Sequence, residues 1–187
     1  MKQMIETWED IVRNTLSPFR QAHTQGVVEV AMKMASAFGQ DGQSVHLAAL
    51  VHDAMREKDP DVLLLMAEEY GLMIGSLEKK YPILLHGPLA AAKLRREYGV
   101  TDESVLQAIS AHTTGEKDMG VLAKIIYIAD MIEKNRDYPG VERLRKLSYN
   151  NIELAFGACL KHNVHHLIER ERKLHRDTVE CWNQFAD

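Results

Sequence analysis

Six side chains that could bind metal ions are spread along the chain, and two of them are adjacent. His52 and Asp53 follow directly on the apolar run at residues 45–51. Burying two polar groups there is costly unless they are paired or bound to a cation. The other four candidates are His23, His86, His112 and Asp130. Each lies in or beside a segment with helical periodicity, so all six could converge on one buried metal centre.

The ligand types limit the metal and suggest how many ions are bound. Imidazole and carboxylate together suit iron, manganese, cobalt, zinc or nickel, and the absence of a cysteine partner argues against a zinc-finger site. Four histidines and two aspartates exceed what one catalytic ion needs, so we expect two ions with one bridging carboxylate. Asp53 is the predicted bridge because it follows His52 directly. Two ions about 3.5–4 Å apart can share a hydroxide and polarise a phosphoryl oxygen.

Each candidate also has a structural explanation when it is taken alone. His23 could be a hydrogen-bonded helix residue, His86 a turn residue before Gly-Pro, and His112 a cation at a helix C-terminus. Asp130 is harder to explain in this way because apolar residues flank it at 125–129 and 131–132. Its carboxylate is therefore expected to face the interior.

The elements that must position these residues are predicted to be helices. Ala, Leu, Met, Glu, Lys and Arg dominate the composition and favour helix, and no segment alternates like a strand for long. Residues 75–85 carry the least clear pattern, and residues 113–118 and 134–140 read as loops. The sequence thus predicts an all-α fold. The expected helices cover about residues 4–16, 19–38, 41–53, 60–71, 88–98, 102–112, 121–133 and 150–172, with a short last one from 178.

Length, charge and cysteine usage narrow the class of protein further. The 187 residues suit one domain, and no linker or internal repeat divides them. The net charge of −4 gives no general attraction to nucleic acid or to anionic membranes. Cys159 and Cys181 form no metal or redox motif. The N-terminus carries acids where a signal peptide would be apolar. No stretch approaches the roughly 20 apolar residues that a membrane span needs. We therefore expect a cytoplasmic protein with no nucleic-acid or membrane partner.

The order of the candidate ligands resembles a known pattern. A His, a His-Asp doublet and a later Asp on a helical core are typical of the HD domain, and the two further histidines resemble its two-metal subset. The segments at residues 20–27, 85–88, 111–115, 128–133 and 136–141 are similar to the YqeK family of symmetrical bis(5'-nucleosyl)-tetraphosphatases. The similarity runs from about Ser17 to Asn183, and His112-Thr-Thr-Gly and Arg136-Asp-Tyr-Pro-Gly are its most distinctive parts.

This resemblance implies a fold and an activity. Residues 1–187 would form a single HD-type helical bundle, with a core at about 17–137 and C-terminal helices completing the pocket. The protein would cleave diadenosine tetraphosphate symmetrically to two ADP by metal-activated water, using two divalent ions. The family's ions are usually iron, with manganese, cobalt and zinc as alternatives, and a homodimer is expected from the resemblance alone. By matching position, the metal ligands would be His23, His52, Asp53, His86, His112 and Asp130.

The resemblance also implies catalytic and nucleotide-binding residues. Asp53, Asp130 and Arg56 would be catalytic, and the nucleotide would contact Arg20, Arg56, Thr113, Arg136, Lys173, His175, Asp177 and Thr178. The arginines among them lie close in sequence to candidate ligands, which favours phosphate binding. Two positions depart from the family pattern. Arg56 replaces a lysine, which changes the geometry of phosphate binding, and Arg176 replaces a proline, which leaves the loop at 173–178 less rigid.

Two alternative functions stay open from the sequence. Another nucleotide phosphohydrolase, such as a deoxynucleotidase or a nucleoside polyphosphate hydrolase, could use the same ligands. A non-catalytic nucleotide-binding sensor is the second alternative, although retention of all six ligands favours an enzyme. Two further clusters are expected to be solvated helix surface: His162, His165 and His166, and Arg143, Arg145 and Lys146.

Overall fold

The computed structural model describes residues 1–186, which contain no β-strand and confirm the all-α prediction. The elements are α1 (Lys2–Thr15), α2 (Pro18–Ala37), α3 (Gly42–Val51), α4 (Pro60–Glu69), α5 (Ser76–Lys80), the 3-10 helix η1 (Pro82–Leu85), α6 (His86–Tyr98), α7 (Glu103–Ser110), α8 (Val121–Ile132), α9 (Val141–Leu147), α10 (Ile152–Glu169) and α11 (Arg176–Ala186).

Helix starts follow the capping residues in the sequence. The Asp41 carboxylate accepts from the backbone N–H of Ser44, and Asp59 caps α4 with Pro60 at the first helical position, both as predicted. Asp102 caps α7, so the choice between Thr101 and Asp102 falls on the aspartate. Each cap satisfies a backbone donor that the helix itself leaves unpaired.

The structure corrects two local expectations, the turn at 86–88 and the solvated Arg145, and it shows helices in two segments for which no bounds were predicted. The predicted turn at residues 86–88 is the first turn of α6, because Pro88 lies where a helix needs no backbone N–H from it. Residues 75–85 form α5 and η1. Beyond the expected loop at 134–140, α9 is a short helix held by tertiary contacts: Val141 and Leu144 are buried. Arg145 is not a solvated residue, because it donates to the backbone carbonyls of residues 132, 133 and 136 at 2.7–2.8 Å.

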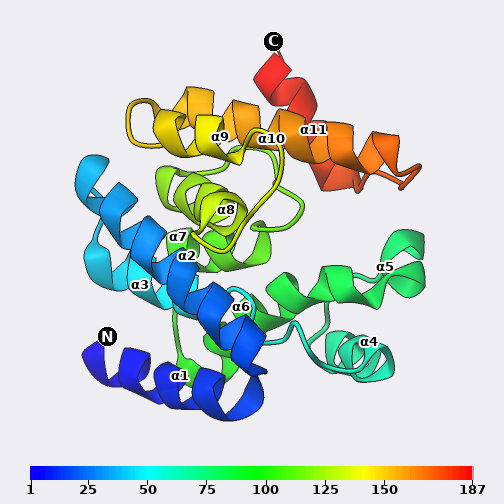
Figure 1. Ribbon diagram of the computed structural model, residues 1–187. Coiled ribbons are helices and arrows are strands. Elements are labelled where there is room, and N and C mark those ends of the chain that lie inside the picture. Colours follow the sequence, from blue (N-terminus) through cyan, green and yellow to red (C-terminus); the bar gives the residue numbers. More distant parts are fainter. Residues whose placement is uncertain (187) are drawn as a thin grey trace.

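The central helix of the bundle is α8, which packs against α2, α3, α7, α9 and α10. Eight of its twelve residues are buried, so it is apolar on nearly every side. Figure 1 shows α9 and α10 lying along one side of α8, with α2 and α3 on another. The helix α1 covers α3 at the N-terminal end, and α4 and α5 lie to the side near α6. Asp130 in the last turn of α8 is thereby carried into the middle of the molecule.

Within the described part of the chain, every helix is either too short or too polar to traverse a lipid bilayer.

Candidate metal centre

The six candidate ligands come from five different places in the bundle and meet at one point. His23 lies on α2, His52 and Asp53 follow α3, His86 opens α6, His112 follows α7, and Asp130 lies on α8. The first five are at most 4% exposed. Ligand atoms of His23, His52 and Asp130 lie within 4.8 Å of one another, and so do those of His52, Asp53 and His112. The predicted convergence is therefore present in the structure.

Each oxygen of the Asp53 carboxylate faces a different pair of histidines. Its Oδ1 lies 3.1 Å from Nε2 of His86 and 3.6 Å from Nε2 of His112. Its Oδ2 lies 3.7 Å from Nε2 of His23 and 3.9 Å from Nε2 of His52. This arrangement divides the cluster into two halves that share one carboxylate, which is the geometry that a bridging ligand requires.

Backbone carbonyls fix the orientation of three imidazoles. In each case Nδ1 lies beside the carbonyl oxygen three residues earlier: His52 beside Ala49 at 2.6 Å, His112 beside Ile109 at 2.7 Å, and His86 beside Ile83. A carbonyl can only accept, so we assign the proton to Nδ1 in all three rings. Their Nε2 atoms then carry lone pairs directed into the cluster, as metal-binding histidines do.

Glu133 orients the fourth imidazole and was missed by the sequence analysis. Its side chain is almost fully buried, and its Oε1 lies 3.2 Å from Nδ1 of His23. Its Oε2 accepts from the backbone N–H of Asn135 at 2.7 Å. A Cβ on residue 26 would collide with this carboxylate, so Gly26 leaves the space it needs. The sequence signal was an acid three residues after Asp130 at the end of the same apolar helix.

The inward-facing nitrogens fit bound cations better than a hydrogen-bonded core. Nε2 of His52 is buried and has no hydrogen-bond partner among the described residues, and Nε2 of His23 lies 3.0 Å from Oδ1 of Asp130 without the geometry of a hydrogen bond. Nε2 of His86 and of His112 lie only 3.0 Å apart. With both protons on Nδ1, these two lone pairs repel each other unless a positive charge lies beside them. Leaving such buried polar atoms unpaired is costly, and a cation in each half of the cluster removes that cost.

The protonation states also suit metal binding. Burial alone would raise the pKa of Asp53, but His52 and the contacts with His112 and His86 lower it well below its usual range. The pKa of Asp130 is lowered likewise, because His23 and Arg136 outweigh the effect of burial. Burial lowers the pKa of His52 to about 4. At neutral pH the cluster therefore contains anionic carboxylates and an uncharged His52, the forms that bind divalent cations. Burial lowers the pKa of His23, but the neighbouring carboxylates of Asp130 and Glu133 outweigh it and raise this pKa, so a cation bound there would displace a proton from His23.

A glycine allows the two halves of the site to approach. Gly87, next to His86, packs directly on the end of α7, where a Cβ would lie 2.8 Å from the backbone oxygen of Ile109 and 3.2 Å from the ring of His112. Any larger residue would push α6 away from α7. This close contact is what brings His86 to within reach of His112.

Three arginines border the cluster, as their positions in the sequence suggested. Nη1 of Arg20 lies 2.9 Å from Oδ2 of Asp53. Arg136 donates to both the backbone oxygen and the carboxylate of Asp130. Arg56 has a weaker contact, 3.4 Å from Nδ1 of His86. The Thr113 hydroxyl lies 3.0 Å from Nε2 of His112.

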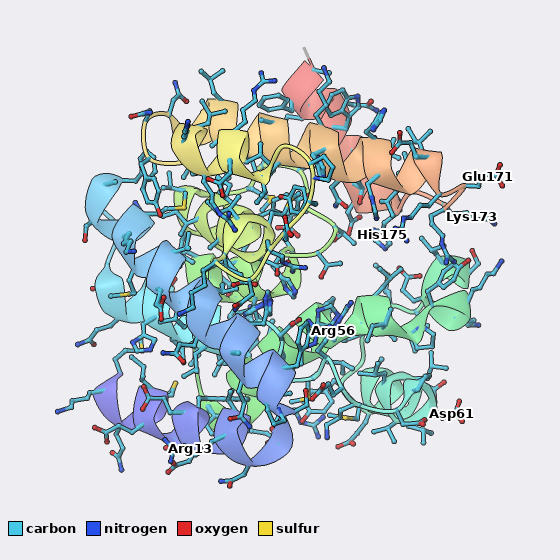
Figure 2. The ribbon with its side chains drawn as sticks, in the orientation of Figure 1. Arg13, Arg56, Asp61, Glu171, Lys173 and His175 are labelled. Carbon is cyan, nitrogen blue, oxygen red and sulfur yellow. The ribbon has the colours of Figure 1, made fainter. Side chains whose placement is uncertain are left out.

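The C-terminal segment is brought only partly to the site. Thr178 is buried, and its hydroxyl donates to the backbone oxygen of Thr114 at 2.7 Å, which attaches α11 to the loop after His112. His175 pairs with Glu78 of α5 at 2.6 Å, and its ring accepts from the backbone N–H of Asp177. Lys173 is exposed. In Figure 2, Lys173 and His175 lie beside the C-terminal helices, while Arg56 lies toward α6.

Comparison with known proteins agrees with this geometry. Residues 20–135 match the family model of the HD domain. The bis(5'-nucleosyl)-tetraphosphatase (symmetrical) of Halalkalibacterium halodurans is 36% identical over 175 residues, which cover 94% of this chain and 93% of that protein. The Bacillus subtilis protein of the same name is 35% identical, with 92% of each chain covered.

A solved structure extends the similarity to three dimensions. The matching crystal structure is that of a Clostridium acetobutylicum protein described as a "predicted HD superfamily hydrolase involved in NAD metabolism". It matches with a TM-score of 0.91 and 31% identity, over 97% of this chain and 96% of that one. The family-model match covers more than half of the chain, and the relatives align with it almost from end to end. The chain therefore belongs to the HD domain family, in the branch of the symmetrical bis(5'-nucleosyl)-tetraphosphatases.

Proposed function

We propose that this chain is a metal-dependent hydrolase that cleaves diadenosine tetraphosphate symmetrically into two molecules of ADP. The observation that carries the proposal is the position of Asp53 between two pairs of histidines whose Nε2 atoms all face it. The similarity to tetraphosphatases over nearly the whole chain supports this substrate over those of other HD-type nucleotide phosphohydrolases. A non-catalytic sensor would have no use for a complete and buried ligand set.

The six clustered side chains would hold two divalent ions. His23, His52 and Asp130 would hold one, His86 and His112 the other, and Asp53 would bridge them. Bound there, the ions would polarise a phosphoryl oxygen of the substrate and make water a better nucleophile at neutral pH. Asp130 would also orient the attacking water. Of the metals that accept this ligand set, we propose iron, with manganese, cobalt or zinc as substitutes.

The bordering cations would bind the polyphosphate chain. Arg56 is partly buried, and its Nη1 lies 3.4 Å from Nδ1 of His86, which carries the ring proton and cannot accept from it, so the guanidinium is available for a phosphate. Arg20 pairs with the Asp53 carboxylate and Arg136 with that of Asp130. With these carboxylates coordinating metal ions, Nη1 of Arg20 and Nη2 of Arg136 would be available for the substrate, while Nε of Arg136 keeps its bond to the backbone oxygen of Asp130. Charge-assisted contacts from these arginines would stabilise the ADP that leaves. Thr113 would add a hydroxyl beside His112.

The remaining assignments rest on the same site and on the similarity to the tetraphosphatases. Lys173, His175, Asp177 and Thr178 would close one side of the nucleotide site, so the C-terminal helices complete a pocket built on residues 17–137. We infer a single domain over residues 1–187, a cytoplasmic location and a homodimer. Light scattering on the purified protein tests the last of these, and metal analysis after anaerobic purification tests the choice of iron.

Product analysis tests the proposed activity directly. The purified protein should convert diadenosine tetraphosphate to ADP alone, and should act far more slowly on nucleoside mono- and triphosphates. The Asp53→Asn variant should bind fewer metal ions and lose turnover. The control Asp61→Asn changes an exposed carboxylate on α4 (Figure 2) and should keep both. An Asp53→Asn protein with full metal content and full turnover would refute the bridging role, and formation of AMP and ATP would refute symmetrical cleavage.

A further inference from the structure

A pocket adjoins the metal centre, and its outer part has no role in the assignments above. It has a volume of about 320 Å³ and lies between the end of α8, the loop at 134–140 and the middle of α10. Asp130, Arg136 and Thr113 form its inner end, and Tyr138, His162 and His166 form its outer part. Among the described residues, none from the 173–178 segment lines it. Its size falls within the range of about 300–1,000 Å³ that is typical of small-molecule sites.

The outer part of this pocket contains a pair of aromatic rings that stack on each other. The rings of Tyr138 and His162 stack, with centroids 4.5 Å apart and planes at 29°. Tyr138 is fixed by its hydroxyl, which donates to the backbone oxygen of Met131 at 2.8 Å. Next to His162, the Asn163 amide donates to the hydroxyl of buried Tyr127 at 3.0 Å. Both histidines were expected on a solvated helix surface. His166 is exposed as expected and lies at the rim of the pocket, whereas His162 is half-buried against Tyr138.

The charges in the pocket are ordered from one end to the other. Arg136 supplies a cation next to the metal centre, and among the described residues of the lining Asp130 is the one carboxylate. Burial and the neighbouring His166 and His165 lower the pKa of His162, so its ring is uncharged at neutral pH. A neutral aromatic face suits a nucleobase, because every base has a π-face that can stack. The pocket therefore offers a cation for phosphate at one end and a stacking surface for a base at the other.

The substrate of the proposed reaction has two nucleosides, and cleavage in the middle of the chain requires both halves to extend away from the metal centre. One half has candidate partners on the side of Thr178 and the 173–178 segment. We propose that the pocket between α8 and α10 binds the second nucleoside, with its base extending the stack of Tyr138 and His162. This inference rests on the proposed function and assigns a specificity role to these two residues.

Counting bound ADP tests the pocket without relying on turnover. Calorimetric titration of the purified, metal-containing protein should find two ADP per chain. His162→Ala should reduce this number to one, and His162→Phe, which keeps an aromatic face, should restore two. The matched control is His165→Ala, three residues along the same helix with a side chain that is 71% exposed, and it should still bind two. One ADP in the wild-type protein, or two in His162→Ala with unchanged affinities, would overturn the proposal.

Steady-state kinetics separate this pocket from a general effect on the active site. For diadenosine tetraphosphate, His162→Ala should raise KM about tenfold, equivalent to about 1.4 kcal/mol of lost binding, and leave kcat within about twofold. For adenosine tetraphosphate, which lacks the second nucleoside, KM should stay unchanged. Equal changes for both substrates, or none for either, would contradict the assignment. If the wild-type protein yields no ADP from diadenosine tetraphosphate, the proposed function fails, while the ADP count still decides whether the pocket is a nucleotide site.

Discussion

Replacing Gly87 with alanine should damage the metal centre without touching a ligand. The new Cβ would lie 2.8 Å from the backbone oxygen of Ile109, which is 0.6 Å short of the 3.4 Å at which ordinary contact begins. Backbone cannot rotate away as a side chain can, so α6 must shift from α7 by about that amount. Metal–ligand distances tolerate only about 0.2 Å. His86 should therefore be carried out of reach of an ion that His112 still holds.

The expected losses differ between the two halves of the site. Overpacking of this kind costs about 1–3 kcal/mol, so thermal denaturation should show a melting temperature lowered by at least about 2 °C, as measured on metal-free protein. Metal analysis should find about one ion per chain where the wild-type protein holds two, because His23, His52 and Asp130 lie on other elements.

The control for this substitution is Gly42→Ala, also in the first turn of a helix. There the new Cβ would meet only the flexible end of Met32, at 3.3 Å, so stability and metal content should be retained. A Gly87→Ala protein with wild-type melting temperature and two ions would show that the α6–α7 approach does not set the position of His86, and the reasoning would be refuted.

Three further predictions concern Glu133, Arg136 and His52. Glu133→Ala should lower metal affinity about 10- to 100-fold, because the His23 ring loses the group that orients it. Competition with a chelator measures this affinity, and Glu142→Gln is the exposed control. An unchanged affinity in Glu133→Ala would exclude the orienting role. Arg136→Ala should raise KM for diadenosine tetraphosphate while metal content stays the same, and unchanged kinetics would remove this arginine from the substrate site. In metal-free protein, burial holds the pKa of His52 at about 4 in the folded state. In the unfolded chain this pKa has its ordinary value of about 6.5. The unfolded chain therefore takes up the proton first as the pH falls. Stability should then drop between pH 6.5 and 4 by up to about 3 kcal/mol; urea unfolding at several pH values measures this, and an identical pH dependence in His52→Asn would contradict it.

Local chemistry in the sequence was sufficient for most of the longer helices and for the residues of the candidate cluster. Capping residues such as Asp41, Asp59 and Asp102 mark helix starts because their side chains satisfy backbone donors within three residues, so the information is entirely local. Asp130 could be assigned to the interior because its apolar neighbours leave no polar face on that helix. The order of His and Asp residues then indicated a two-metal HD domain, and the comparisons confirm the family.

Local chemistry was not sufficient where tertiary contacts decide the structure. The short helix α9 exists because Val141 and Leu144 are buried and Arg145 reaches the carbonyls at the end of α8, and no seven-residue window contains that information. The start of α6 at His86 was obscured because Gly-Pro is also typical of a turn. The role of Glu133 depends on a contact with His23, which is 110 residues away in the chain.

The sequence by itself determined that this protein is a helical bundle with six potential metal ligands, because residue type and helical period are properties of short segments. Only the tertiary structure decided how those ligands are shared, with one oxygen of Asp53 toward His86 and His112 and the other toward His23 and His52. It also decided that His162 lies in a pocket with Tyr138 and not on a solvated surface. The physical reason is the same in both cases: the direction in which a side chain points toward a distant partner depends on how helices pack, and packing is a property of the whole chain.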